Sequence, residues 1–340
     1  MSVSDGSWPQ ILGSNAGTET SGHIPGPRLV DGGRAAIPFF SLRGRFDGAT
    51  VVVTAGSHGD ELNAVRAAAA LRGAISTQEL SGNLVVLPAL NPIAFRDRSR
   101  LSVLSPTDLS NLHDSFPGRA TGDSVSRMTA AIVEAVAVRI SPDLIIDLHT
   151  GALGNYCRPH CFYAATGKDE VVRGAAEAAR AFDTGVVIRA GTDLPAYATS
   201  SMIHAWAHER GIAAIGVELG TAIPSESQQV STGVGGIRNV LAALGMLPAE
   251  TAAPMSQLII DKVVDVRAPF GGLCELHVSA GHDVAAAAPL ATISTVFGEK
   301  LGDVATPVAG HLIGVTSLGA LNEGERIARI GIVSSESRAS

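Results

Sequence analysis

Short apolar runs alternate with segments of helical periodicity through the first 250 residues. Apolar runs bounded by polar or glycine residues predict buried strands at 35–42, 50–54, 82–88, 143–148, 186–189 and 212–219. Recurrence of apolar residues every three to four positions predicts helices at 62–72, 124–140, 168–182, 200–210 and 230–244. Asp47-Gly48 predicts a hairpin turn between the first two strands. This alternation is typical of a largely parallel sheet with helices on both faces.

The pattern changes near residue 254. From Val263 onward, short apolar segments are separated by Gly, Asn and Asp with almost no helical periodicity, which predicts a small all-β module. At the other end, the first 28 residues are rich in Ser, Gly, Pro and Thr and predict a loose arm. We therefore expect an N-terminal arm at 1–28, an α/β domain at 29–254 and a C-terminal β domain at 255–340.

The composition and charge of the chain argue against several classes of protein. Hydrophobic residues make up 46% of the 340 positions and charged residues 17%, so the chain can bury a substantial core. The net charge of −7 and the lack of a basic stripe argue against a nucleic-acid partner. No apolar run has transmembrane length, no secretory signal is evident, and three cysteines form no disulfide framework. We expect a cytoplasmic protein with a small-molecule partner and no membrane partner, and homo-oligomer formation is left open.

The turn after the predicted strand at 50–54 carries a candidate metal-binding pair. It reads Gly56-Ser57-His58-Gly59-Asp60-Glu61 and places His58 and Glu61 three residues apart, just before a predicted helix. Imidazole nitrogen and carboxylate oxygen are ligands that suit Zn²⁺. The same turn also fits a simpler interpretation, in which its acidic residues only stabilise the first turn of the helix.

A zinc site needs a third ligand, and His149 is the best candidate. It directly follows the predicted strand at 143–148, whose end can lie beside the one that carries His58 in a parallel sheet. Asp147, two residues earlier, could fix the tautomer of an imidazole. The alternatives are a histidine bonded only to backbone groups and an aspartate that caps a turn.

Glu218 and a group of arginines are candidates for the catalytic groups. Three protein ligands leave one position on zinc for water, and a hydrolase needs a carboxylate near that water to transfer its proton. Glu218 ends the apolar strand at 212–219, where desolvation raises a carboxyl pKa; an exposed strand-end glutamate is the alternative. A developing oxyanion needs a fixed positive charge, and Arg96, Arg98 and Arg100 are close together after Asn91-Pro92. Tyrosines that could line the pocket are Tyr156, Tyr163 and Tyr197.

Taken together, these motifs resemble one known family. They appear in the order Gly56-Ser57-His58-Gly59-Asp60-Glu61, Asn91-Pro92-Ile93-Ala94, Arg100, Phe116-Pro117-Gly118, Asp147-Leu148-His149-Thr150-Gly151 and Val217-Glu218-Leu219-Gly220. Each motif alone is weak, but their order and spacing look like the succinylglutamate desuccinylase/aspartoacylase family, relatives of the zinc carboxypeptidases. The likeness spans roughly residues 35 to 335, including a C-terminal β module.

The resemblance implies a fold and a set of roles. The fold is a zinc-carboxypeptidase-like mixed sheet flanked by helices, with a small C-terminal all-β domain. One Zn²⁺ per chain is held by His58, Glu61 and His149. Glu218 is the general base and proton shuttle, with zinc-bound water as the nucleophile. Arg100 matches the arginine that polarises the scissile carbonyl and stabilises the oxyanion.

One segment departs from the family pattern. The family usually carries Asp-Leu-Asn-Arg before Phe-Pro-Gly, and its Asn-Arg pair binds the α-carboxylate of the substrate. Here the segment reads Asn111-Leu112-His113-Asp114-Ser115, so His113 replaces the Asn and Asp114 replaces the Arg. Asn111, His113 and Asp114 are therefore our candidate substrate-binding residues. A carboxylate at 114 repels a substrate carboxylate, whereas an arginine would bind it in a bidentate way.

Two interpretations of this departure stay open. In the first, which we favour, the substrate lacks a carboxylate there or carries an ammonium group that pairs with Asp114. In the second, another arginine takes over the task, and the candidates are Arg96, Arg98, Arg119 and Arg158. Loss of activity is a third possibility, and the intact ligand set together with Glu218 argues against it.

The sequence therefore predicts a zinc-dependent amidohydrolase. We expect it to act as a deacylase on the amide bond of a small N-acyl amine or N-acyl amino-acid derivative. One alternative is a non-catalytic, zinc-containing binding protein, which the missing Asn-Arg pair favours. Another is a carboxypeptidase that acts on peptides, which fits the chemistry but not the missing carboxylate-binding pair.

Overall fold

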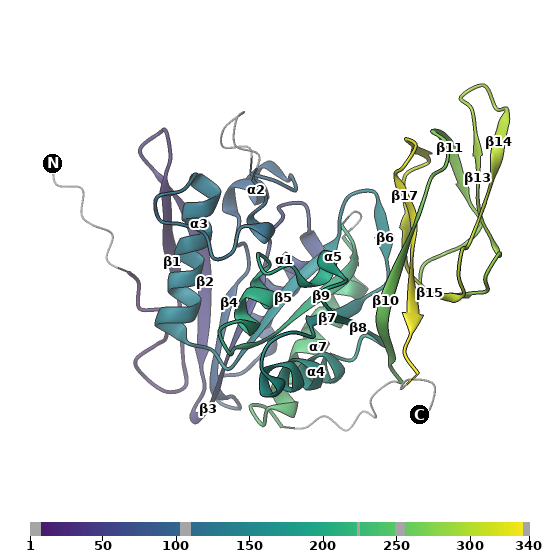
Figure 1. The fold of residues 1–340 in the computed structure, drawn as a ribbon. Coiled ribbons are helices and arrows are strands. Elements are labelled where there is room, and N and C mark those ends of the chain that lie inside the picture. Colours follow the sequence, from purple (N-terminus) through teal and green to yellow (C-terminus); the bar gives the residue numbers. More distant parts are fainter. Residues whose placement is uncertain (1–7, 103–109, 223–224, 249–255, 336–340) are drawn as a thin grey trace.

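The computed structural model of the chain describes residues 8–102, 110–222, 225–248 and 256–335. A large mixed sheet runs through the molecule, and a small antiparallel sheet lies at the C-terminal end (Figure 1). The large sheet contains, in spatial order, β1 (Thr18–Arg28), β2 (Arg34–Arg43), β4 (Ser81–Leu87), β3 (Phe46–Ala55), β5 (Leu144–Gly151), β9 (Ala213–Thr221), β7 (His160–Ala164), β8 (Val186–Ala190), β10 (Leu258–Arg267), β17 (Arg326–Val333), β15 (Gly310–Thr316) and β12 (Asp283–Val284). A short strand, β6 (Asn155–Cys157), pairs with β15.

The centre of this sheet is parallel. β4, β3, β5 and β9 run in the same direction. On one side β2 is antiparallel to β4 and to β1, and on the other β7 is antiparallel to β9 but parallel to β8. The central strands are apolar on both faces, which is the expected pattern for strands covered by helices on both sides. The predicted mixed α/β sheet with flanking helices is confirmed.

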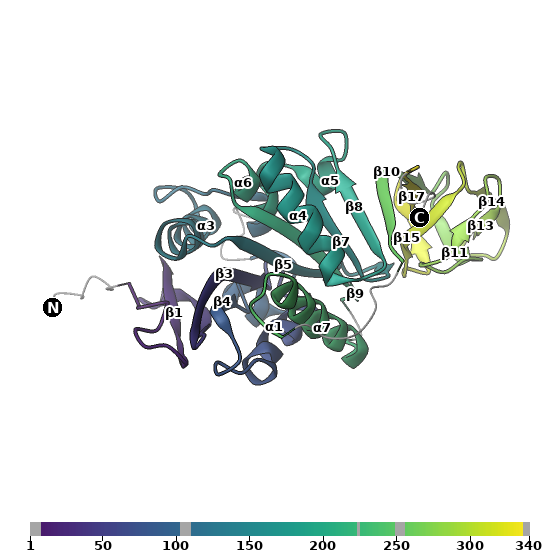
Figure 2. The same ribbon diagram turned by 90° about the horizontal axis from the view of Figure 1, so that it is seen from below.

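Helices cover both faces of the sheet. α1 (Leu62–Ala74), α4 (Asp169–Phe182) and α7 (Ser227–Ala243) pack on the alternate strand residues that include Val51, Ile146 and Val217. The other face, which includes Val52 and Ile145, is covered by α3 (Ser124–Val133), its π-helical continuation η2 (Glu134–Ile140) and α6 (Ile203–His208). Figure 2 shows α1 and α7 side by side on one face, with α3 and α6 beyond the other.

The C-terminal β domain is joined to this sheet. β10 pairs in parallel with β8 and antiparallel with β17, so the main sheet continues into the domain. The separate small sheet contains β14 (Lys300–Ala305), β13 (Pro289–Ser294), β11 (Gly272–Leu276) and β16 (Ala320–Leu321). The predicted small C-terminal β region is therefore present, and its strand β17 lies beside the α/β part of the molecule.

Three local predictions differ from the structure. Residues 18–28 of the predicted loose arm form the edge strand β1, because main-chain hydrogen bonds to β2 need no strongly apolar sequence. Asp47-Gly48 lies inside β3 and makes no hairpin, since β4 is inserted between β2 and β3. The helix predicted at 200–210 is shortened to α6, preceded by α5 (Pro195–Ala198). Among the described residues, no helix is long and apolar enough to span a membrane.

Candidate metal centre and active site

Two glycines shape the turn that carries His58 and Glu61. The turn follows β3, and Gly56 has a positive φ of 67°, which other residues adopt only with strain. Gly59 packs against α2 (Pro92–Asp97) so closely that an added Cβ would lie 1.9 Å from the carbonyl oxygen of Ala94. This close packing fixes the turn and points both side chains at one place.

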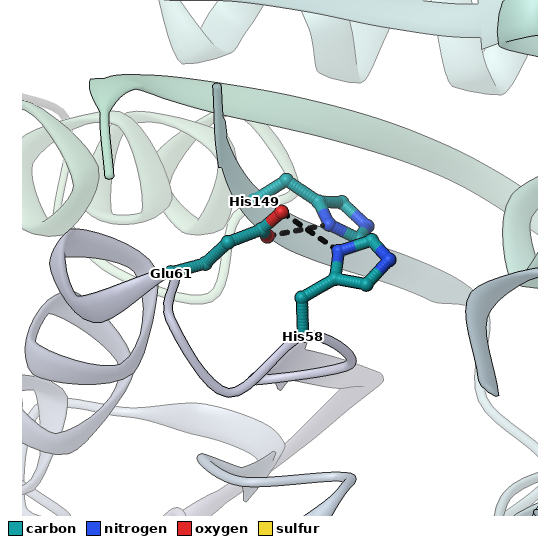
Figure 3. Close-up of side chains that lie close together, drawn as sticks. All are labelled: His58, Glu61 and His149. Carbon is teal, nitrogen blue, oxygen red and sulfur yellow. Dashed lines mark hydrogen bonds and ion pairs between the residues drawn. The ribbon is translucent and has the colours of Figure 1, made fainter. Parts of the chain in front are cut away.

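The carboxylate of Glu61 points toward the rings of His58 and His149, which lie next to each other (Figure 3). His58 Nδ1 is 2.7 Å from Glu61 Oε1, and His149 Nδ1 is 2.9 Å from Glu61 Oε2. Glu61 occupies the N-cap position of α1 but makes no capping hydrogen bond with its side chain. The simpler interpretation of this acid as a helix cap is therefore wrong, because its carboxylate is used by the histidines and by the Thr150 N–H.

The outer nitrogens of both histidines are held by acceptors. His149 Nε2 lies 2.7 Å from Asp147 Oδ2, and the other oxygen of Asp147 accepts a hydrogen bond from Thr54. His58 Nε2 lies 3.0 Å from Asn111 Oδ1. An acceptor at Nε2 requires the proton on that nitrogen, so the Nδ1 lone pairs are left to face Glu61.

This arrangement fits a metal ion. The three side chains are buried, and their ligand atoms lie within 4.8 Å of one another. Burial alone would lower the pKa of His149, but the carboxylates of Asp147 and Glu61 raise it well above its ordinary value. These carboxylates thus favour a positive charge at this position, either as an imidazolium or as a bound cation. Two imidazole nitrogens and a carboxylate oxygen are a ligand set that zinc accepts, with a carboxylate supporting one histidine from behind.

Glu218 lies beside His149 on the neighbouring strand. The two residues are register partners in the parallel pair β5–β9, so their side chains point to the same face of the sheet. Both strands extend past these residues, to Gly151 and Thr221, whereas the sequence pattern predicts strand ends at these positions. Oε2 of Glu218 is buried and has no hydrogen-bond partner among the described residues. Burial, with the charge of Glu61 added, raises the pKa of Glu218 to about 7.

Arg100 reaches the same centre. Its Nη1 donates a hydrogen bond of 3.1 Å to Glu61 Oε1, and 42% of its side chain is exposed. Tyr197 also lines the site, while Tyr156 and Tyr163 do not. The structure therefore brings together His58, Glu61, His149, Glu218 and Arg100.

The segment that departs from the family pattern borders the same centre. Asn111 supports His58, and its amide donates to Asp114 Oδ2 at 2.7 Å. His113 is buried with its ring 4.6 Å from that of His149 and its Nδ1 3.9 Å from Asp147 Oδ2. His113, Asp147 and His149 form a second possible ligand group that shares His149 with the first. Asp114 is exposed and lines the cavity beside these residues.

A cavity of about 260 Å³ contains the site, and the C-terminal β domain forms part of its wall. Arg326 and Arg329 of β17 line it, and neither was a candidate from the sequence. Residues three apart on a regular strand point to opposite faces. Here the pairing slips between Ala328↔Val266 and Arg326↔Arg267, so one extra residue of β17 forms a bulge between the two arginines. No local sequence signal indicates this bulge.

The arginines proposed as replacements lie elsewhere. None of Arg96, Arg98, Arg119 and Arg158 is among the residues that line the cavity. Arg98 ends α2 in a left-handed conformation, and the Arg158 side chain packs at Gly281.

The family model of the succinylglutamate desuccinylase/aspartoacylase catalytic domain matches residues 47–244 of this chain. A curated relative, the N-alpha-acetyl-L-2,4-diaminobutyric acid deacetylase of Halomonas elongata, is 29% identical over 256 residues, which cover 74% of this chain and 72% of the relative.

Solved structures share the fold over nearly the whole chain. The product-bound ectoine utilization protein EutE (DoeB) from Ruegeria pomeroyi is 25% identical with a TM-score of 0.80, covering 92% of this chain and 95% of that one. A succinylglutamate desuccinylase/aspartoacylase from Rhodobacter sphaeroides is 24% identical with a TM-score of 0.80, covering 93% and 96%. A succinylglutamate desuccinylase from Silicibacter sp. TM1040 is 23% identical with a TM-score of 0.81, covering 96% and 98%.

Proposed function

Since the chain belongs to the succinylglutamate desuccinylase/aspartoacylase family, we propose that it is a zinc-dependent deacylase of small N-acyl amines or N-acyl amino-acid derivatives. The family and the deacetylase relative support a hydrolase of amide bonds other than peptide bonds. The observation that carries the zinc site is the convergence of His58 Nδ1 and His149 Nδ1 on the two oxygens of Glu61. These three residues would hold one zinc ion per chain.

The residues around this centre divide the chemistry among them. When bound, zinc polarises a carbonyl and lowers the pKa of water. Glu218, with a pKa of about 7 and one buried oxygen without a partner among the described residues, accepts a proton from the attacking water. It then delivers the proton to the leaving nitrogen, which departs as the free amine. Arg100 stabilises the negative charge that develops on the carbonyl oxygen.

Asp147 and Asn111 act through the histidines. Each accepts the Nε2 proton of one histidine and so presents the Nδ1 lone pair toward Glu61. Tyr197 closes one side of the cavity, and the Asp114 carboxylate borders it on another.

The two alternatives are less well supported. A binding protein that uses zinc only structurally has no need of a half-buried carboxylate with a pKa of about 7 beside the ligands. A peptide substrate needs an open cleft, whereas this cavity is small and is bordered by the C-terminal β domain. Both features favour a small substrate that is hydrolysed.

Metal-dependent hydrolysis of N-acyl compounds tests the proposal. The purified protein should contain about one zinc ion per chain and release acetate from Nα-acetyl-L-2,4-diaminobutyrate or a related N-acyl amino acid. Removal of the metal with 1,10-phenanthroline should abolish turnover, and added Zn²⁺ should restore it. If the metal-loaded protein hydrolysed none of a broad panel of amides, this result would contradict the proposed enzymatic function and favour a non-catalytic binding protein.

A further inference from the structure

The C-terminal β domain contributes positive charge to the cavity. Arg326 and Arg329 line it from β17, although about 110 residues separate them from Glu218 in the chain. The wall is held in place by the main sheet, because β10 pairs with both β8 and β17 (Figure 1). Two arginines from a separate domain thus border the pocket of the catalytic centre.

Arg329 uses its guanidinium for structure. Its Nε and Nη2 donate to the two oxygens of Asp265 at 2.8 and 3.2 Å. Its Nη1 donates to the Tyr197 hydroxyl at 3.0 Å. Arg329 therefore ties the C-terminal domain to Tyr197, and little of its hydrogen-bonding capacity remains for a ligand.

Arg326 differs from Arg329 because its guanidinium is not occupied by hydrogen bonds to the part of the protein that the structure describes. Its Nη1 lies 3.8 Å from Asp265 Oδ2, and no hydrogen bond from its guanidinium is found among the described residues. One third of its side chain is exposed, and it lines the cavity. It thus presents an arginine fork with free donors to the pocket.

The charges around Arg326 are unbalanced. The guanidinium groups of Arg267, Arg326 and Arg329 all lie within 4 Å of the single carboxylate of Asp265. Three positive charges therefore share one negative charge at this wall. Clustered guanidinium groups repel one another, so an anion that binds beside Arg326 relieves this repulsion.

We propose that Arg326 is a specificity-determining residue that binds a free carboxylate of the substrate. This inference rests on the proposed deacylase function. A planar guanidinium with free donors binds a carboxylate through two parallel hydrogen bonds, and it supplies here the positive charge that Asp114 cannot. The chain then uses another arginine for the carboxylate, but one from the C-terminal domain rather than Arg96, Arg98, Arg119 or Arg158.

Matched substrates test this role. Nα-acetyl-L-2,4-diaminobutyrate and its carboxamide differ only in the carboxylate. In Arg326→Gln, kcat/KM for the acid should fall about tenfold to a hundredfold, mainly through KM, while that for the carboxamide stays within about twofold. Arg326→Lys should recover part of the loss. Arg267→Gln, which removes a charge near Asp265 but no side chain that lines the cavity, is the control and should change the ratio of acid to carboxamide much less than Arg326→Gln does.

A second pair of substrates shows whether the carboxylate that Arg326 binds belongs to the acyl group or to the amine. An N-succinyl alkylamine carries its carboxylate on the acyl group, and an N-acetyl amino acid carries it on the amine. If Arg326→Gln lowers kcat/KM for only one of these two substrates, Arg326 binds the carboxylate of that substrate. The result then shows whether this carboxylate belongs to the acyl group or to the amine. An equal loss on the acid, the carboxamide and both members of this pair would overturn the proposal.

Binding measurements keep this test independent of turnover. Calorimetric titration of the metal-loaded protein with L-2,4-diaminobutyrate and with its amide should show tighter binding of the acid, and Arg326→Gln should remove the difference. Equal affinities in the parent protein, together with normal deacylation and no selective loss on the N-succinyl alkylamine in Arg326→Gln, would overturn the role of Arg326 and leave the enzyme intact. Selective acid binding without deacylation would instead overturn the proposed function alone.

Discussion

His149 and Glu218 stand at the same register position on the adjacent parallel strands β5 and β9. Their side chains therefore project from the same face of the sheet, one toward Glu61 and one into the cavity. The alternation of the strand keeps the neighbours Leu148 and Val217 in the apolar core on the opposite face. One register thus joins a candidate metal ligand and a carboxylate whose Oε2 is buried, without help from any loop.

Replacement of Glu218 should separate metal binding from turnover. Glu218→Gln keeps the size of the side chain but cannot accept a proton, so we expect kcat to fall about 10²- to 10⁴-fold. Zinc content should remain that of the parent protein, because Glu218 is not in the ligand group. Metal analysis and initial-rate kinetics check both. Glu209→Gln, an exposed change, is the control; turnover at the parent rate in Glu218→Gln would contradict the assigned role.

Asp147 should govern metal affinity through His149. An asparagine at 147 can turn its amide N–H toward Nε2, which would move the imidazole proton to Nδ1 and block the ligand atom. We expect Asp147→Asn to weaken zinc binding about 10- to 100-fold, as measured by competition with a chelator.

Thr54→Val is the matched control for that change. It removes only the hydroxyl that donates to the second oxygen of Asp147, so its effect should be smaller. Unchanged zinc affinity in Asp147→Asn would show that the Asp147–His149 contact does not set the tautomer.

The turn at Gly59 should not accept a side chain. A Cβ there meets the backbone of Ala94 at 1.9 Å, so Gly59→Ala must displace α2 or the turn. We expect it to destabilise the fold by about 1–3 kcal/mol and to lower zinc affinity, because His58 and Glu61 shift with the turn. Urea unfolding and metal competition check these effects.

Gly73 offers a matched control in the helix that follows. An added Cβ meets nothing within 4 Å there, so Gly73→Ala should be neutral or stabilising by up to about 1 kcal/mol. Equal stability of the two variants would contradict the packing argument at Gly59.

Because of Asp265, the stability of the fold should depend on pH in the acidic range. Burial alone would raise its pKa, but the hydrogen bonds and charge of Arg329, with the charges of Arg326 and Arg267, hold that pKa below the ordinary 3.8. A carboxyl whose pKa is lower in the folded state stabilises the fold above its unfolded pKa. This contribution disappears as the pH falls through the folded pKa.

Urea unfolding of Asp265→Asn and the parent protein tests this dependence. The difference in the free energy of unfolding should be constant above about pH 5 and should shrink below about pH 4. Asp97→Asn, an exposed change at the end of α2, is the control. A difference for Asp265→Asn that stays constant down to pH 3 would contradict the role of this cluster.

Local patterns are sufficient to predict most of the fold and the centre of the site. The apolar runs that form β3, β5 and β9 are buried on both faces, so each contains its own strand signal. Because these strands are parallel neighbours, the polar residues near their carboxyl ends meet at one edge. The residue pattern alone therefore identifies His58, Glu61, His149 and Glu218 as members of one site.

Other features depend on pairing between distant segments. The edge strand β1 is specified by main-chain hydrogen bonds to β2 rather than by an apolar pattern. β4 pairs with both β2 and β3 and so separates these two strands in the sheet. The residues around Asp47 likewise carry no signal of this strand order.

The sequence by itself determined which residues are candidates for the centre, because the candidate ligands and Glu218 lie within or beside strongly patterned strands. Tertiary structure alone decided the part of the cavity wall that comes from β17. The bulge in β17, and the pairing of β10 with β8, bring Arg326 into the cavity from a domain remote in the chain. Strand register and bulges arise from long-range pairing energies, so periodicity along one segment could not reveal them.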